Sequence, residues 1–221
     1  MPKTLAMIHT VAGLAPMFQS LCNELMPEVT PFHIADEGLR RMVMAAGGLT
    51  PAIHRRVGEN AACAQEAGAD LILVTCSSIS PCVDVVSQMV TVPVLKIDEP
   101  MADKAISLGA HIGVVATAKT TLKPTSELIV ARSAAAGKKT QVEAVLCEGA
   151  YDQLFAGNVA EHDRIVKEYL LRMMQTVDVI VLAQASMARV ADAIPTSERR
   201  VPILSSPRMG MERTRDVIRT L

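Results

Sequence analysis

The chain has 221 residues, of which half are hydrophobic but only three are Phe, two Tyr and none Trp, and its formal net charge is -1. This length is enough to bury a substantial core, which must be built from aliphatic side chains. The balanced charge and the scarcity of aromatic residues argue against nucleic acid as a partner, because nucleic-acid binders usually carry a basic stripe with stacking aromatics. No apolar run reaches the roughly 18 residues that a membrane helix needs, so we expect no membrane association.

The N-terminus and the cysteines indicate a cytoplasmic protein. Leu5–His9 is apolar but far shorter than the apolar core of a signal peptide. The five cysteines are an odd number with irregular spacing, and none form a CxxC pair. We therefore expect neither disulfides nor a structural metal site.

Short apolar runs rich in β-branched residues recur along the chain, and Gly, Pro, Asp, Ser or Thr bound each of them. Such runs are typical of strands in a parallel sheet that is covered on both faces. They are Leu5–Ile8, Leu71–Val74, Val92–Ile97, Ile112–Val115, Val142–Leu146, Val177–Leu182 and Val201–Leu204. Helical periodicity lies between them, at Thr50–Gly68, Thr125–Gly137 and Glu161–Gln175. This alternation predicts an α/β architecture.

The sequence also repeats itself at an offset of about 108 residues. The matching pairs are Met7–Thr10 with Val114–Thr117, Ala69–Val74 with Val177–Leu182, Val92–Val94 with Val201–Ile203, and Glu99–Met101 with Pro207–Met209. We predict two pseudo-symmetric lobes, each a mostly parallel sheet flanked by helices. Residues 1–100 with about 205–221 would form the first lobe, and residues 101–204 the second. Because α/β sheets bind ligands at the carboxyl ends of their strands, we expect the active site in the cleft between the lobes.

The strongest chemical signal is Val74–Ser80, where a predicted strand leads into Cys76 and then into small hydroxylated residues. Small residues leave backbone N–H groups open to an anion, and such a setting favours the thiolate. A thiolate beside a bound carboxylate could take a proton from carbon. The alternative is a structural cysteine packed at a strand end.

A second signal is Ala116–Thr121, which also follows a predicted strand. Its hydroxyl groups, its backbone N–H groups and Lys119 could bind a carboxylate. The alternative is an ordinary N-cap of the following helix.

Several segments resemble the aspartate/glutamate racemase superfamily, which includes glutamate, aspartate and hydantoin racemases, maleate isomerase and arylmalonate decarboxylase. They are Val74–Ser78, Thr117–Thr120, Val201–Pro207, Asp36–Leu39 and Pro93–Asp98. The resemblance implies a two-lobed α/β fold, a small carboxylate-bearing substrate and no cofactor. It also implies two opposed cysteines, one per lobe, that act as acid and base. Cys76 would be the first-lobe thiol, and Ser77, Ser78, Thr117 and Thr120 would bind the substrate carboxylate.

The second cysteine of that pair is missing. It should fall in Val181–Met187, which contains none. The internal repeat places Gln184 opposite Cys76, whereas matching Asp192–Pro195 to the superfamily places Ala185 there. Neither residue can relay a proton as a thiol does.

We therefore expect a cofactor-independent racemase or isomerase that acts at the α-carbon of a small carboxylate or carbonyl compound with Cys76 as its single catalytic thiol. One alternative is a one-thiol decarboxylase of the arylmalonate decarboxylase type. The other is a two-lobed carboxylate-binding protein without turnover. A homo-oligomer is compatible with each. The expected substrate-binding residues are His9, Thr10, Ser77, Ser78, Thr117, Ala118, Lys119, Thr120, Gln184, Ala185 and Ser186, with no metal ligand among them.

Other polar residues and cysteines have simpler interpretations. We expect Cys22, Cys63, Cys82 and Cys147 to be packing residues. Glu161–Asp163 is interpreted as a helix-capping segment because adjacent residues at a helix start point in different directions. For Lys96 and Asp98 we expect surface or inter-lobe positions.

Overall fold

The computed structural model describes residues 2–221 and divides them into two compact units. The first lobe comprises residues 2–98 and Pro207–Leu221, and the second lobe comprises Glu99–Ser206. No helix within residues 2–221 combines the length and the apolar character needed to cross a membrane.

The first lobe is built around a four-stranded sheet of order β2-β1-β3-β4 in which every pair is parallel. Its strands are β1 (Thr4–His9), β2 (Thr30–Ala35), β3 (Leu71–Val74) and β4 (Val94–Lys96). Its helices are α1 (Ala15–Leu25), α2 (Glu37–Ala46), α3 (Pro51–Glu66), α4 (Val83–Val86) and α10 (Ser206–Ile218), with short 3-10 turns at Ala12–Leu14 and Ser80–Cys82.

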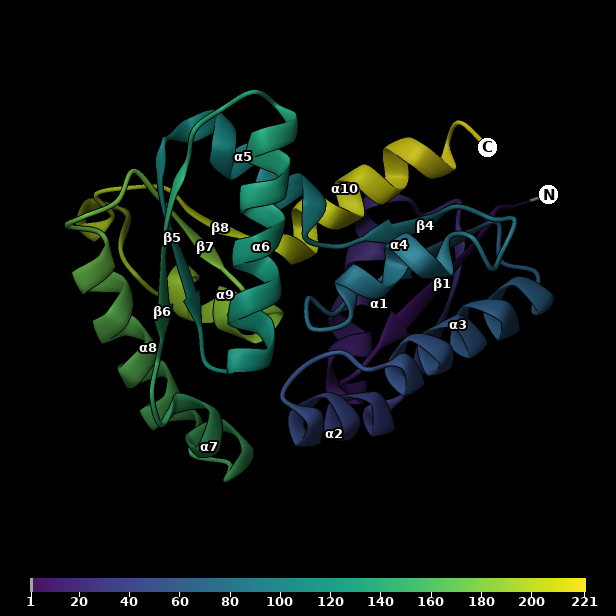
Figure 1. Cartoon of the computed structure of the whole chain (residues 1–221), viewed down its shortest axis with the longest axis horizontal. Helices are drawn as coiled ribbons and strands as arrows, with labels where there is room; N and C mark the ends of the chain where they lie inside the picture. Colours follow the sequence, from purple (N-terminus) through teal and green to yellow (C-terminus); the bar gives the residue numbers. More distant parts are fainter. Residues whose placement is uncertain (1) are drawn as a thin grey trace. The chain divides into compact units, whose positions relative to one another are not determined.

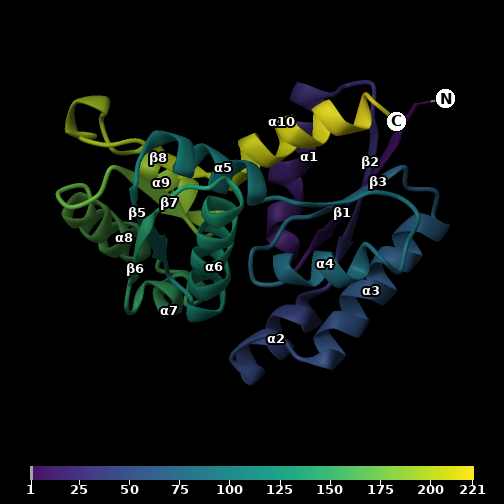
Figure 2. The same ribbon diagram turned by 45° about the horizontal axis from the view of Figure 1, so that its top comes forward.

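Alternation along the strands gives this sheet two buried faces. In β1, Ala6 and Ile8 pack toward α2, α3 and α4, while Leu5 and Met7 pack toward α1 and α10. Figure 1 shows α2, α3 and α4 together on one side of the sheet, and Figure 2 shows α10 beside α1. The C-terminal helix therefore completes the core of the first lobe.

The second lobe has a four-stranded sheet of order β6-β5-β7-β8, again parallel throughout. Its strands are β5 (His111–Ala116), β6 (Gln141–Leu146), β7 (Val179–Leu182) and β8 (Ile203–Ser205). Its helices are α5 (Glu99–Leu108), α6 (Lys119–Ala135), α7 (Ala150–Phe155), α8 (Val159–Met173) and α9 (Ala188–Asp192), with 3-10 turns at Ala185–Met187 and Thr196–Glu198. Helices α5 and α6 cover one face of the sheet and α8 covers the other (Figure 1).

The two sheets share one topology, which confirms the predicted fold of two similar α/β units. Strand register is also shared: Ile8 pairs with Val74 in the first lobe, and Val115 pairs with Leu182 in the second. Beyond the last pair, Thr75 N–H donates to Ile8 O, and Ala183 N–H donates to Val115 O. The repeat in the sequence is therefore a repeat of backbone hydrogen bonds.

Strand β2 and the start of helix α6 differ from the sequence-based expectation. Strand β2 was not predicted, because it is a half-exposed edge strand that contains Pro31 and His33 rather than an apolar run. Helix α6 begins at Lys119, six residues before the predicted start at Thr125, and it accommodates Pro124 early in its length.

We expect Gly210→Ala in α10 to destabilise the protein, although Ala is the better helix former by about 1 kcal/mol. A Cβ atom at residue 210 would lie 2.5 Å from the backbone oxygen of Ile97, which cannot rotate away. Overpacking of this kind costs about 1–3 kcal/mol. Chemical denaturation should show this loss in the free energy of unfolding. Gly13→Ala is the control, because nothing lies within 4 Å of a Cβ there. Equal stability of the Gly210→Ala variant and the parent would contradict the close approach of α10.

Candidate active site

Thr10 and Cys76 meet at the carboxyl end of the first sheet. Thr10 directly follows β1 and Cys76 lies two residues after β3, and these two strands are hydrogen-bonded neighbours. The Thr10 hydroxyl donates to Cys76 Sγ at 2.9 Å. The structure therefore brings together two residues that the sequence assigned to one site.

A second hydroxyl group contacts the same sulfur. Ser78 Oγ lies 2.9 Å from Cys76 Sγ. Thr10 and Ser78 are buried, whereas Cys76 is partly exposed. Two hydroxyl groups can thus donate to a thiolate while the sulfur keeps access to a ligand.

Asp98 anchors the loop that carries Cys76. This carboxylate is 1% exposed and accepts a hydrogen bond from Ser80 Oγ at 2.6 Å and another from the Ser77 side chain. Burial raises the pKa of Asp98, although these hydrogen bonds oppose the change. A surface position for Asp98 is therefore wrong, because the residue is buried, whereas an inter-lobe contact stays a prediction. Lys96, for which a surface or inter-lobe position was also expected, is mostly buried and pairs with Asp84 at 2.6 Å.

His9 supports the residue that precedes Cys76. Its ring is fully buried, with Nδ1 2.8 Å from Thr75 Oγ1 and Nε2 2.8 Å from His33 Nδ1. Because Thr75 donates its proton to Ile8 O, it must accept from His9 Nδ1–H. Burial, and secondarily the charge of His33, lowers the pKa of His9 to about 4. Both ring nitrogens thus have protein partners, and contact of His9 with a substrate stays a prediction.

The other cysteines divide into two kinds. Burial raises the pKa of Cys22 to about 11 and the pKa values of Cys82 and Cys147 to about 12. The negative charge of Glu28 adds a smaller increase at Cys22, and that of Asp84 adds one at Cys82. These three thiols are packing residues, as predicted. The prediction for Cys63 is wrong: it lies on the outer face of α3 and is exposed.

The second lobe has an equivalent pair, Thr117 and Gln184. Thr117 follows β5 as Thr10 follows β1, and its N–H and hydroxyl groups donate to Gln184 Oε1 at 2.6 and 3.0 Å. Shared strand register places Gln184, rather than Ala185, at the position equivalent to Cys76. A carboxamide oxygen therefore takes the place of the sulfur as the partner of the threonine.

The turn after this position is also shared. Met187 N–H donates to Gln184 O as Ile79 N–H donates to Cys76 O, at 3.1 Å in both lobes. Ala185 and Ser186 lie in this turn and are half-buried. They correspond to Ser77 and Ser78 of the first lobe.

The start of α6 does not use a threonine as its cap. Ala118 is the N-cap residue and makes no side-chain capping bond, while the Thr117 hydroxyl group is directed to Gln184. Lys119 is exposed at the first helical position, and Thr120 is half-buried beside it. The loop thus contains the N-cap of α6, as the alternative interpretation expected, but no side chain makes the capping bond; a role in substrate binding stays a prediction.

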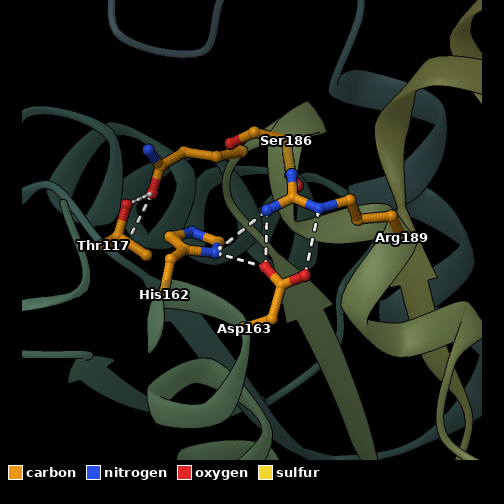
Figure 3. Close-up of polar contacts among 6 residues, drawn as sticks. Thr117, His162, Asp163, Ser186 and Arg189 are labelled. Carbon is orange, nitrogen blue, oxygen red and sulfur yellow. Dashed lines mark hydrogen bonds and ion pairs between the residues drawn. The ribbon is translucent and has the colours of Figure 1, made fainter. Parts of the chain in front are cut away.

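Three further residues of the second lobe were not assigned to the site from the sequence. Asp163 and His162 of α8 contact Arg189 of α9, and Figure 3 shows this cluster beside Thr117 and Ser186. The capping role expected for Glu161–Asp163 is wrong, because α8 has Asn158 as its N-cap without a side-chain bond.

A signal for His162 was nevertheless present in the helix periodicity. The buried residues of α8 are His162, Val166, Leu170 and Met173, spaced as Ile53, Val57, Ala61 and Ala64 are in α3. A histidine at the position of a core isoleucine needs a polar partner, and Asp163 supplies it.

Other places in the molecule fit a site less well. A shallow hollow of about 430 Å³ lies at the amino end of the second sheet, lined by Ala110, His111, Lys139, Thr140, Gln141 and Asp178. It contains none of the candidate residues and lies opposite the end where α/β sheets bind ligands. Among residues 2–221, no group of three or more His, Cys, Asp or Glu side chains could hold a metal ion.

Known proteins share this fold across nearly the whole chain. Glutamate racemase from Francisella tularensis subsp. tularensis, in complex with D-glutamate, has a TM-score of 0.77 at 12% identity and covers 99% of this chain and 82% of its own. Allantoin racemase from Klebsiella pneumoniae has a TM-score of 0.67 at 16% sequence identity, and the match covers 99% of this chain and 88% of that protein's chain. Aspartate racemase from Picrophilus torridus has a TM-score of 0.70 at 10% sequence identity, and the match covers 97% of this chain and 94% of that protein's chain.

Sequence comparison gives the family. No curated protein matches the chain. The family model described as Asp/Glu/Hydantoin racemase matches residues 19–214, which confirms the resemblance found in the sequence. This chain belongs to the Asp/Glu/hydantoin racemase family.

Proposed function

We propose that the protein is a cofactor-independent racemase or isomerase that acts at the α-carbon of a small carboxylate or carbonyl compound, with Cys76 as its single catalytic thiol. The observation that carries the proposal is the contact of Cys76 Sγ with two hydroxyl groups at the carboxyl end of the first sheet. Family membership supports the reaction class. The related structure that holds D-glutamate supports a small carboxylate as the ligand.

The first chemical step follows from the surroundings of the sulfur. Hydrogen bonds from Thr10 and Ser78 can stabilise a thiolate, which can take the proton from the carbon next to a carboxylate. The carbon then carries an electron pair that is delocalised onto the carboxylate oxygens. Hydrogen-bond donors at the carboxyl ends of the strands would stabilise that charge.

The residue that would act on the second face of the substrate carbon is not a cysteine in this chain. Gln184 occupies the position equivalent to Cys76, and a carboxamide neither gives nor takes a proton at neutral pH. With Gln184 Oε1 accepting two bonds from Thr117, its NH₂ group remains to donate to a substrate oxygen. Cys76 would then remove and return protons on one face, unless another group serves the second face.

This asymmetry favours a second candidate, a one-thiol decarboxylase of malonate-type substrates. Loss of CO₂ leaves the same delocalised carbanion, and the Cys76 thiol donates a single proton to one face. The thiolate then regains its proton from solvent. This reaction needs no second thiol, so the Gln184 position is compatible with it.

One experiment separates these functions. Proton NMR in D₂O with a panel of amino acids, hydantoins and malonates should show loss of an α-proton signal for a racemase or isomerase. A changed carbon skeleton would identify the decarboxylase. No change in any substrate, with saturable binding of a carboxylate, would identify a binding protein and refute the catalytic proposal.

Alkylation should identify Cys76 as a reactive thiol. With iodoacetamide near pH 8, we expect modification at Cys76 and at the exposed Cys63, because the three buried thiols have raised pKa values and no access to reagent. Peptide mass spectrometry gives the modified sites. A saturating carboxylate ligand should protect Cys76 but leave Cys63 reactive, which makes Cys63 an internal control. An unreactive Cys76 in the folded protein would count against a catalytic thiol.

Cys76→Ser should lower turnover at least about a hundredfold and leave folding nearly unchanged. Serine keeps the shape but replaces a thiol whose reference pKa is about 8.5 with a hydroxyl that is scarcely ionised at neutral pH. Steady-state kinetics on the substrate found by NMR, with thermal unfolding as a check, measure both effects. Cys63→Ser is the matched control and should keep full activity. Full activity in the Cys76→Ser variant would disprove the mechanism.

Gln184→Cys should add proton transfer on the second face. The new thiol would have the Thr117 hydroxyl as its donor, as Cys76 has Thr10. We expect racemisation of an amino-acid or malonate-derived substrate to rise at least about tenfold, measured by chiral chromatography. Ala185→Cys is the control, because it lies one residue beyond the equivalent position. A gain in Ala185→Cys but none in Gln184→Cys would show that the register-based equivalence does not extend to the chemistry.

A further inference from the structure

Arg189 presents a fixed guanidinium group on the segment that follows Gln184. Its Nε donates to Asp163 Oδ2 at 3.2 Å, and its Nη2 donates to Asp163 Oδ1. Its Nη1 donates to the backbone oxygen of Ser186 at 3.0 Å. Figure 3 shows Arg189 beside Ser186 and Asp163. Three contacts from two directions define the plane of the group.

His162 holds Asp163 in place from the buried side. Its Nδ1 lies 2.6 Å from Asp163 Oδ1, a distance that requires a proton on Nδ1 when the carboxylate is ionised. The 3.2 Å approach of Arg189 Nη2 to the same Nδ1 is therefore a contact between two donors. Burial tends to raise the pKa of Asp163, but hydrogen bonds from Arg189 and His162 outweigh it and lower that pKa. The carboxylate is thus ionised at neutral pH.

Burial of His162 lowers the stability of the folded protein, because one of its ring nitrogens has no partner within residues 2–221. Its side chain is fully buried, and Nε2 has no hydrogen-bond partner among the residues that the structure describes. An aliphatic residue occupies the equivalent position in α3, at Ile53. A buried polar atom without a partner costs about 1–3 kcal/mol, so the site gives up stability to keep an imidazole behind Asp163.

The guanidinium group keeps donors for a ligand. Of its five N–H groups, those not used by Asp163 and Ser186 are one on Nη1 and one on Nη2. The Arg189 side chain is 42% exposed, so solvent or a ligand can reach it. Two N–H groups on one planar cation match the two oxygens of a carboxylate.

The position of Arg189 relates it to the candidate site. It lies five residues after Gln184, on the segment that leaves the carboxyl end of β7. The equivalent position after Cys76 is Pro81, which has no side-chain donor. A positive charge is thus present at this position in the second lobe and absent from its counterpart in the first.

We propose that Arg189 is a specificity-determining residue that binds a carboxylate group of the ligand, and that Asp163 and His162 are positioning residues for its guanidinium group. The proposal rests on the proposed function in taking a small carboxylate as the ligand. It adds that one carboxylate is recognised by a cation of the second lobe rather than by neutral donors alone.

Calorimetric titration with malonate, succinate and D-glutamate tests this directly. For the probe that binds the parent most tightly, Arg189→Gln should raise the Kd at least about tenfold, because a hydrogen bond to a charged group contributes about 1.5–3 kcal/mol. Arg189→Lys should recover part of the affinity, since it restores charge but not the planar fork. Arg172→Gln is the control, an arginine of α8 that is 72% exposed and pairs only weakly with Glu168.

The positioning roles need a measurement that general destabilisation would not change. Asp163→Asn should raise KM by about three- to tenfold with kcat nearly unchanged, and Asp163→Glu should recover part of the loss. His162→Phe removes the donor to Asp163 but fills the buried space, so it should weaken binding while thermal unfolding stays close to that of the parent. Equal effects on kcat and KM, or no recovery in Asp163→Glu, would overturn the positioning roles.

The outcomes also separate this proposal from the catalytic one. Cys76→Ser should bind the probe as the parent does, because Arg189 remains in place. Binding that depends on Arg189 without turnover of any substrate would refute catalysis and support the carboxylate site. Unchanged affinity in Arg189→Gln, or no binding of any of the three probes by the parent, would overturn the role of Arg189.

Discussion

In each lobe, the candidate residues depend on one hydrogen bond. A threonine at the end of one central strand donates it to the side chain that follows the neighbouring strand. Thr10 donates to Cys76, and Thr117 donates to Gln184. Neighbouring parallel strands bring their carboxyl ends to one edge, so the backbone ladder alone fixes these pairs within a few ångströms. The pairs would be lost if either strand slipped by one residue, because the side chains would then change faces.

Around these similar pairs the two lobes differ in charge. In the first lobe, the loop after Cys76 is tied down by buried Asp98, which contacts Ser77 and Ser80 rather than the sulfur. In the second lobe, the segment after Gln184 carries Arg189, balanced by an ionised Asp163. The hydrogen bonds of Asp98 thus hold the loop that carries Cys76, whereas the ion pair of Asp163 holds the guanidinium group of Arg189.

Much of the fold and part of the candidate site could be predicted from the sequence, for identifiable reasons. Buried parallel strands are apolar on both faces and therefore visible as runs, whereas edge strand β2 is half-exposed and was missed. Thr10, Cys76, Thr117 and Gln184 could be proposed because each lies two residues after the end of a predicted strand. Asp98 and Arg189 act through residues 18 and 26 positions away, and no local pattern records such contacts. The choice between Gln184 and Ala185 needed the hydrogen-bond register, which the repeat in the sequence gives only to within one residue.

The Thr117–Gln184 pair shows how the same backbone can hold a carboxamide where the first lobe holds a thiol. A threonine N–H and hydroxyl can donate to sulfur or to a carboxamide oxygen, so the backbone does not need to change when the acceptor does. A carboxamide cannot transfer a proton, but its NH₂ group can hold a substrate oxygen. An arginine five residues later can add a charge that a proline cannot supply. The two lobes thus share one backbone arrangement but present different side chains at the equivalent position: a thiol between two hydroxyl groups in the first lobe, and a carboxamide followed by an arginine in the second.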